Sequence, residues 1–241
     1  MEDWKRRLYK SYVSTGQAGY KDEKKNFYNP YYDKIIKNFL PKNKNLFILD
    51  LACGYGRLVY SLKAHGYTNV IGVDISEEQV AIAHKLGITE VISQDLNIFL
   101  ENSEPNKYDV VFLMDIMEHL EKPELFDLLD RIYAIMTNHG ILIIHVPNGV
   151  GIFGMKVRYG DFTHTNAFTQ QSIKQILQAC NFSEIKCFED DPVINSPYNL
   201  IRNLLWHVLV FPFRLLLIIE SGFKKYILSQ NMLVIAKKYS K

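Results

Sequence analysis

Cysteine is scarce in this sequence, and no strong excess of charge marks it. The three cysteines, Cys53, Cys180 and Cys187, form no C-x-x-C pair and no zinc spacing, which disfavours a zinc site or a dithiol redox motif. Because their number is odd and no apolar run follows the charged residues 1–7, we expect a reducing cytoplasmic location and no secretory signal. A net charge of +2 disfavours nucleic-acid binding driven by overall charge.

Long apolar runs and low-complexity segments are also missing. No stretch reaches the roughly 18 uninterrupted apolar residues of a membrane-spanning helix. The 13 glycines and 8 prolines are ordinary numbers for 241 residues. With 48% hydrophobic residues, the chain can bury a sizeable core, and its length fits one large domain or one domain with an insertion.

Short apolar runs alternate with helical patterns along most of the chain. Strands are expected at residues 46–49, 70–73, 90–93, 110–114, 141–146, 184–188 and 232–237. Helices are expected at residues 29–40, 55–65, 76–86, 123–136 and 169–179. Strands that are apolar on both faces and separated by helices indicate a parallel sheet covered on both sides. We therefore predict a doubly wound α/β fold with a mostly parallel seven-stranded sheet.

This pattern divides the chain into four parts. Residues 1–44 form an N-terminal helical arm, in which Tyr12, Tyr20 and Tyr28 either close over a ligand or pack on the sheet edge. Residues 45–190 form the core, residues 191–230 an apolar helical insertion, and residues 231–241 the final strand.

A turn rich in small residues follows the first strand. The segment Asp50-Leu51-Ala52-Cys53-Gly54-Tyr55-Gly56 joins this strand to a helix, and small residues there let a backbone approach a ligand. Asp74 ends the second strand, where a carboxylate suits a pair of ribose hydroxyls. Val59 occupies the third glycine position of a G-x-G-x-x-G motif, which disfavours a dinucleotide.

The pattern D-x-A-C-G-x-G resembles motif I of the class I S-adenosylmethionine-dependent methyltransferases, with Ala52 in place of the usual first glycine. The resemblance extends to Asp74 and to Gln94-Asp95-Leu96 after the third strand. It implies a Rossmann-like methyltransferase fold and S-adenosylmethionine as the cofactor. By resemblance, Asp50 and Gly54 contact the amino-acid part of the cofactor, Asp74 the ribose, and Asp95 with Leu96 the adenine. The implied cofactor-binding set also includes Ala52, Gly56 and Ile75.

Acidic residues and a histidine follow the fourth strand. Asp115, Glu118 and His119 are spaced i, i+3 and i+4, so on a helical turn they share a face at the carboxyl edge of the sheet. Two carboxylates and an imidazole there fit either a divalent-metal site or local caps of the turn. His164 lies in a second loop at the same edge, just before a helix that opens at Thr169.

The two fragments together resemble the metal-dependent small-RNA 2′-O-methyltransferases, which carry E-x-x-E-H after the fourth strand and a later histidine before a helix. Ubiquinone-pathway O-methyltransferases show a similar E-x-x-E-H, and both families methylate one hydroxyl of a vicinal diol. The resemblance implies Asp115, Glu118, His119 and His164 as ligands of Mg²⁺ or Mn²⁺, although Asp115 is one methylene shorter than the family's Glu. Without metal, His119 or His164 is a candidate general base, and Asp115 is a further candidate catalytic residue.

An apolar segment interrupts the pattern before the last strand. In residues 198–219, Pro212 is predicted to kink the helical segment or to split it into two helices, and Arg202 and Arg214 break any continuous apolar span. Three roles remain open: a roof over the acceptor pocket, a homodimer interface, or peripheral contact with a membrane.

The motif D-F-T-H-x-x-A-F-T at residues 161–169, followed by apolar helices, looks like methyltransferases of bacterial surface-polysaccharide pathways. This resemblance implies an S-adenosylmethionine-dependent O-methyltransferase acting on a hydroxyl of a sugar, a sugar-linked metabolite or a glycan. The alternatives are a quinone or catechol O-methyltransferase and a non-catalytic cofactor-binding scaffold. The expected partners are a small-molecule or glycan acceptor and not nucleic acid, and the expected place is the cytoplasm, at a membrane surface if the insertion contacts lipid.

Overall fold

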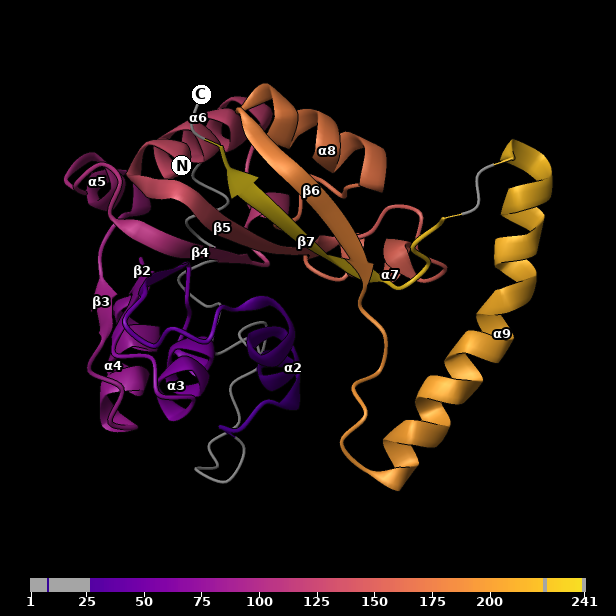
Figure 1. The fold of residues 1–241 in the computed structure, drawn as a ribbon, viewed down its shortest axis with the longest axis horizontal. Helices are drawn as coiled ribbons and strands as arrows, with labels where there is room; N and C mark the ends of the chain where they lie inside the picture. The colour runs from indigo at the N-terminus through magenta and orange to yellow at the C-terminus, as the bar shows by residue number, and fades with distance from the viewer. Residues whose placement is uncertain (1–7, 9–26, 223–224, 240–241) are drawn as a thin grey trace.

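A seven-stranded sheet forms the centre of the molecule, in a computed structural model that describes residues 8, 27–222 and 225–239 (Figure 1). The strands are β1 (Phe47–Leu51), β2 (Asn69–Asp74), β3 (Val91–Ser93), β4 (Tyr108–Met114), β5 (Met136–Pro147), β6 (Phe182–Glu189) and β7 (Asn231–Lys238). Their order is β3-β2-β1-β4-β5-β7-β6, and only β7 runs antiparallel to its neighbours. The predicted fold class is confirmed. Tyr12 and Tyr20 lie outside the described residues.

Helices connect the strands where the sequence predicted them, with two additions. The helices are α2 (Pro30–Phe39), α3 (Arg57–Ala64), α4 (Glu77–Lys85), α5 (Leu96–Glu101), α6 (Lys122–Ile135), α7 (Gly154–Arg158), α8 (Gln170–Ala179) and α9 (Pro197–Ser221). Ser76 caps α4 through the N–H of Gln79, and Thr169 caps α8 through the N–H of Ser172. The short helices α5 and α7 were not predicted, because five or six residues carry too little periodicity to recognise.

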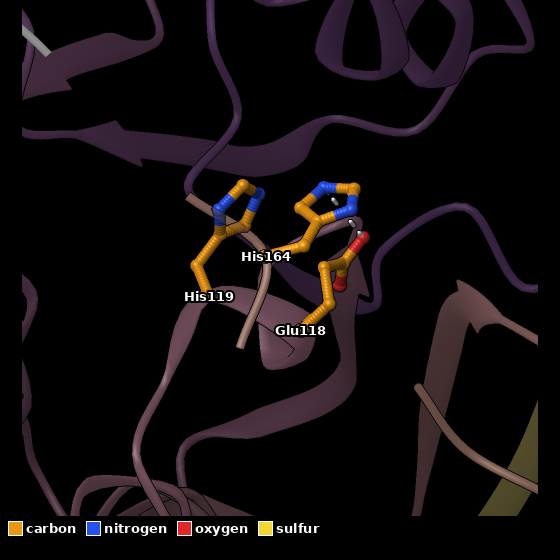
Figure 2. Close-up of side chains that lie close together, drawn as sticks. All are labelled: Glu118, His119 and His164. Carbon is orange, nitrogen blue, oxygen red and sulfur yellow. Dashed lines mark ion pairs between the residues drawn. The ribbon is translucent and has the colours of Figure 1, made fainter. Parts of the chain in front are cut away.

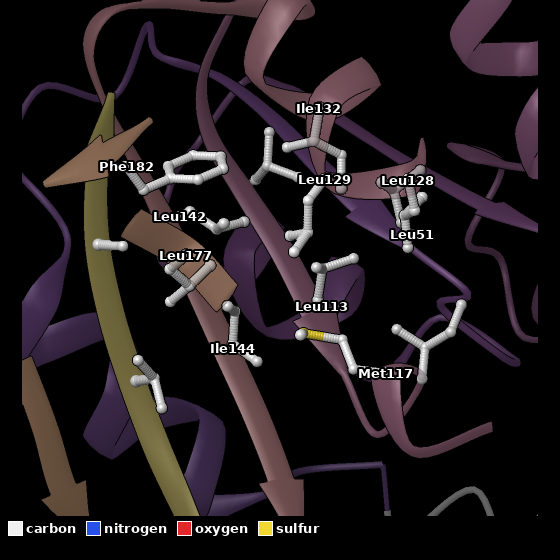
Figure 3. Packing of buried hydrophobic residues seen from close by; sticks show 14 of the residues in the cluster. Leu51, Leu113, Met117, Leu128, Leu129, Ile132, Leu142, Ile144, Leu177 and Phe182 are labelled. Carbon is white, nitrogen blue, oxygen red and sulfur yellow. The ribbon is translucent and has the colours of Figure 1, made fainter. Parts of the chain in front are cut away.

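Successive side chains of each strand point to opposite sides of the sheet, and helices bury those on both sides. In β4, Val111 and Leu113 face the core under α5, α6 and α8, whose packing Figure 3 shows. Val110 and Phe112 face the second core, under α2, α3 and α4. With both faces covered, the carboxyl edge of the sheet is the place left for a polar site.

The apolar insertion contains one continuous helix, α9, so the predicted split into two helices at Pro212 does not occur. Ser196 caps its start and Gly222, in a left-handed conformation, ends it. Pro212 lies inside the helix, where a proline removes one backbone hydrogen bond but need not end the helix if the flanking turns keep theirs. By length and composition alone, α9 is apolar enough to cross a membrane. Figure 1 shows it beside the sheet.

The predicted boundaries after residues 44, 190 and 230 fall in connections between elements of the structure. In the N-terminal part, Tyr28 is exposed and its hydroxyl donates to the Asp33 carboxylate at 2.6 Å. Its role as part of a lid stays a prediction.

Candidate active site

The turn after β1 contains three left-handed positions, Ala52, Gly54 and Gly56, with φ angles of 58°, 57° and 79°. A Cβ at Gly54 would lie 2.9 Å from the Gln79 side-chain oxygen. At Gly56 it would lie 2.8 Å from a methyl group of Val91. At Gly54 the flexible Gln79 side chain could move aside, so backbone freedom is the main reason for glycine, whereas at Gly56 the buried Val91 side chain also leaves no space for a Cβ. Ala52 adopts the left-handed conformation despite its Cβ.

Two of the predicted cofactor-binding carboxylates shape the surrounding loops. The Asp74 carboxylate accepts the backbone N–H groups of Gly54 and Ser76, each at 2.8 Å, and so ties the turn after β1 to the end of β2. The Asp95 carboxylate accepts the N–H of Asn97 at 2.9 Å and caps α5. Both acids are thereby fixed at the carboxyl edge of the sheet.

Asp50, at the end of β1, is 2% exposed, and its Oδ1 has no hydrogen-bond partner among the described residues. Burial, reinforced by the nearby Asp74 carboxylate, raises the pKa of Asp50 well above its usual value. A buried carboxyl group without a partner is costly, and a cationic ligand would relieve that cost.

A cavity of about 530 Å³ opens beside these groups. Seven of the eight predicted cofactor-binding residues line it: Asp50, Ala52, Gly54, Asp74, Ile75, Asp95 and Leu96. The eighth, Gly56, caps the N-terminus of α3. An acidic lining fits S-adenosylmethionine, whose sulfonium and amino groups are positive, and the orphaned Asp50 oxygen is a ready partner for the amino group.

Glu118, His119 and His164 come together beside this cavity (Figure 2), and His119 lines it. Glu118 and His119 belong to a short 3-10 helix (Met117–His119), and His164 comes from the loop before α8. One ligand atom from each lies within 4.8 Å of the others. The structure thus assembles three of the four predicted metal ligands, from segments far apart in the sequence.

Neighbouring oxygens fix the orientation of both imidazoles. The Thr163 hydroxyl donates to Asp161 at 2.6 Å, so it accepts from His119 Nδ1 at 2.8 Å, which places the His119 lone pair on Nε2. His164 Nδ1 donates to the Val157 carbonyl at 3.0 Å, and its lone pair is also on Nε2. Such contacts are typical of histidines that bind metal through the other nitrogen.

The Glu118 carboxyl group is buried, and its Oε2 has no hydrogen-bond partner among the described residues. Its Oε1 lies 4.0 Å from His164 Nε2, too far for a hydrogen bond but close to the length of two metal–ligand bonds of about 2.1 Å each. Burial, and then the Asp115 charge, raise the pKa of Glu118 to about 8. The three residues therefore fit a divalent cation in donor type and spacing.

Asp115 does not join this cluster, contrary to the sequence prediction. Its backbone is left-handed, with φ 56°, so residue 115 is not on a helical turn with Glu118 and His119, and the expected shared face does not form. Its carboxylate instead lies 2.5 Å from His145 Nδ1, at the end of β5. Asp115 still lines the cavity, so its predicted catalytic role stays open.

His145 is held between two carboxylates, since its Nε2 lies 3.1 Å from Asp190. Burial lowers the pKa of His145, but the charges of Asp115 and Asp190 outweigh it and raise the pKa well above its usual value. Both ring nitrogens are protonated donors in this state, so neither can bind a metal. The ring of Tyr31 packs edge-on against His145, with centroids 5.5 Å apart.

A model of the methyltransferase domain family matches residues 24–186, more than half of the chain. The chain belongs to this family. By family and fold it is a class I S-adenosylmethionine-dependent methyltransferase, which confirms the first resemblance. The family match ends before α9.

Solved structures share the fold of this methyltransferase. A SAM-dependent methyltransferase from Archaeoglobus fulgidus has a TM-score of 0.64 at 23% identity, over 85% of this chain and 92% of that one. Phosphoethanolamine N-methyltransferase 2 of Haemonchus contortus, in complex with S-adenosyl-L-methionine, has a TM-score of 0.58 at 21% identity, over 87% and 52%. At these identities the likeness extends to the fold alone.

Curated relatives match shorter stretches. N-terminal Xaa-Pro-Lys N-methyltransferase 1 of Xenopus tropicalis is 31% identical over 121 residues, 46% of this chain and 54% of the relative. Ubiquinone biosynthesis O-methyltransferase of Bordetella bronchiseptica is 32% identical over 80 residues, 32% of this chain and 33% of the relative. The matches thus span from a third to about half of these relatives.

Three residues near this site were not predicted from the sequence: His145, Asp190 and Thr163. His145 had a signal, because it is the polar residue within the apolar run 141–146, and parallel register pairs it with Met114, next to Asp115. Asp190 and Thr163 had none that distinguishes them from ordinary loop residues.

Proposed function

We propose that this protein is an S-adenosylmethionine-dependent O-methyltransferase whose acceptor is one hydroxyl of a vicinal diol. The observation that carries the proposal is the position of the Glu118–His119–His164 cluster at the border of the acidic cofactor cavity. A hydroxyl group is a weak nucleophile at neutral pH. A cluster that binds two neighbouring hydroxyls beside the methyl donor overcomes both the weak reactivity and the problem of orientation.

Each residue of the site would have a distinct chemical role. Glu118, His119 and His164 would hold a divalent cation such as Mg²⁺ or Mn²⁺, which would act as a Lewis acid and lower the pKa of the acceptor hydroxyl. Asp50 binds the amino group of the cofactor and so directs its methyl group toward the acceptor end. The oxygen–methyl bond forms as the sulfur–methyl bond breaks, leaving S-adenosylhomocysteine. With the cation bound, the acceptor hydroxyl would lose its proton to solvent. Without a metal, the His119 Nε2 lone pair would be the base that accepts this proton instead.

For the acceptor, we propose a sugar or glycan diol, on the strength of the D-F-T-H-x-x-A-F-T resemblance, in surface-polysaccharide synthesis. A catechol or quinol is the second candidate, because relatives include ubiquinone biosynthesis O-methyltransferases. A cofactor-binding scaffold without activity is disfavoured, since a scaffold has no need for two oriented imidazoles beside a buried carboxyl group.

The test measures the formation of S-adenosylhomocysteine with a panel of sugar cis-diols and catechols as acceptors. Each acceptor is compared with an analogue that lacks one of the two hydroxyls. We expect turnover with a diol and Mn²⁺, loss of turnover with EDTA, and little turnover with the single-hydroxyl analogue. The variant His119→Ala/His164→Ala should lose turnover while it keeps its affinity for S-adenosylhomocysteine. Turnover that survives in this variant, or on single hydroxyls without metal, would contradict the proposal.

A further inference from the structure

The helix α9 exposes apolar side chains to an extent unusual for a protein surface. Twelve large apolar residues from Tyr198 to Ile219 are between 43% and 72% exposed: Tyr198, Leu200, Ile201, Leu204, Leu205, Val208, Leu209, Phe211, Phe213, Leu215, Leu216 and Ile219. Only 6% of the most apolar window of the helix is buried. A continuous apolar surface of this length marks an interaction site.

The stripe of α9 that touches the protein carries its polar contacts, on either side of the buried Val210. Asn203 donates to the Asp191 carboxylate at 3.2 Å and to a backbone carbonyl at 2.9 Å, and His207 Nε2 lies 3.4 Å from the same carboxylate. Arg214 forms an ion pair with Glu189 at 2.6 Å. Residues 203, 207 and 214 recur at helical spacing, so they form one stripe. In a surface helix surrounded by water the arrangement is the reverse, with the apolar stripe inward and the polar face outward.

We propose that α9 lies in the plane of a phospholipid bilayer, with its outward face among the acyl chains. A second copy of the chain fits less well, because a helix pair covers a narrow seam of each helix. Here, at 3.6 residues per turn, the exposed apolar side chains occupy somewhat more than half of the circumference. Lipid acyl chains can cover such a surface without shape complementarity.

The topology of the sheet excludes a single crossing of the membrane by α9. The strands before and after it are paired neighbours, with Glu189 opposite Met232, so both ends of the insertion start at one place on the sheet. If α9 spanned the bilayer, residues 222–230 would have to return through the hydrocarbon core. These nine residues are too few for a membrane-spanning helix, and their sequence includes Lys224 and Lys225. Unpaired backbone and charges are not tolerated there. In the plane, the helix of about 37 Å needs no such return.

The ends of the helix carry residues typical of the membrane interface. Tyr198 and Arg202 lie at the start, with the guanidinium 5.8 Å from the ring centroid, and Lys224 and Lys225 follow the end. Tyrosine at headgroup level and bases near anionic lipid both favour such a position. We therefore expect binding to be strongest on bilayers that contain phosphatidylglycerol.

The test is flotation of the full chain with vesicles of phosphatidylethanolamine and phosphatidylglycerol. Leu205→Gln/Leu209→Gln/Leu216→Gln removes apolar side chains from the outward face and leaves the polar stripe intact. The matched control, Phe47→Gln/Ile98→Gln, removes similarly exposed side chains elsewhere. We expect the parent and the control to float, and the triple variant to lose vesicle binding by about tenfold or more. Its unfolding temperature and its affinity for S-adenosylhomocysteine should match those of the parent, which shows that it is folded.

Two results would overturn the inference. A parent protein that stays with the aqueous fractions would exclude the bilayer. A parent that forms dimers in solution, which the triple variant dissociates without any vesicle binding, would assign the helix to a second copy. Spin labels placed at residues 201, 209 and 216 in a cysteine-free background test the orientation. Similar depths support a helix in the plane, whereas a much greater depth at residue 209 means that it crosses.

Discussion

Two groups of histidines and carboxylates lie at the same edge of the sheet, and they differ in what the imidazoles contact. In the first, His119 and His164 each use Nδ1 on a neutral oxygen, so both lone pairs are on Nε2, in a cluster with Glu118. In the second, both nitrogens of His145 contact carboxylates. The first group suits a cation or a proton acceptor, and the second is already a closed ion cluster. Hydrogen-bond partners, more than proximity to the cavity, decide which histidines take part in chemistry.

The largest effect expected is on folding, from the closed cluster. Asp190→Ala leaves the buried imidazolium of His145 without one of its two partners, so the free energy of unfolding should fall by about 3 kcal/mol. The affinity for Mn²⁺ should stay within about twofold of the parent value. Urea unfolding and calorimetry measure the two quantities, with Glu104→Ala at an exposed site as the control. A large loss of Mn²⁺ affinity would mean that the two clusters act as one.

The second prediction concerns the cofactor end of the cavity. Asp50→Asn should weaken S-adenosylhomocysteine binding by about thirtyfold, because it removes a charged partner of the cofactor amino group. The same change should stabilise the protein without cofactor, since the raised pKa of Asp50 means that its charge costs stability at neutral pH. Calorimetry measures the expected loss of affinity, and urea unfolding at pH 7 measures the expected gain in stability. Unchanged affinity would remove Asp50 from the cofactor site.

A smaller effect is expected from the residue that orients His119. Thr163→Val removes the oxygen that His119 Nδ1 contacts and should weaken Mn²⁺ binding by about tenfold. Thr163→Ser keeps the hydroxyl and should bind Mn²⁺ like the parent. If the two variants behave alike, the hydroxyl does not orient the imidazole.

The smallest effect is a dependence on pH. A metal binds the ionised form of Glu118, whose pKa of about 8 leaves it mostly protonated at pH 7. Mn²⁺ affinity should therefore rise about fivefold between pH 7 and pH 8 as this proton is lost, and then level off. In Glu118→Gln, which has no such proton, this part of the rise should be missing. A similar rise in this variant would assign the proton to another group.

The features that sequence predicted well are local in the chain. The helix starts at residues 76 and 169, the glycine turn and the strand rhythm each depend on residues a few positions apart. The pairing of Asp115 with His145 depends on the register of β4 with β5 and on one left-handed backbone angle, which no short pattern encodes. The same applies to α9. Its composition was visible, but its unbroken course through Pro212 and its inward polar stripe appear only when the helix is placed beside Glu189 and Asp191.

The most direct test is calorimetric titration of Mn²⁺ into metal-stripped protein saturated with S-adenosylhomocysteine, beside the variant His119→Ala/His164→Ala. The account predicts one site per chain in the parent and none in the variant, with equal affinity of both proteins for S-adenosylhomocysteine. Equal Mn²⁺ binding by parent and variant, or no binding by the parent, would contradict the assignment of this cluster as the metal centre.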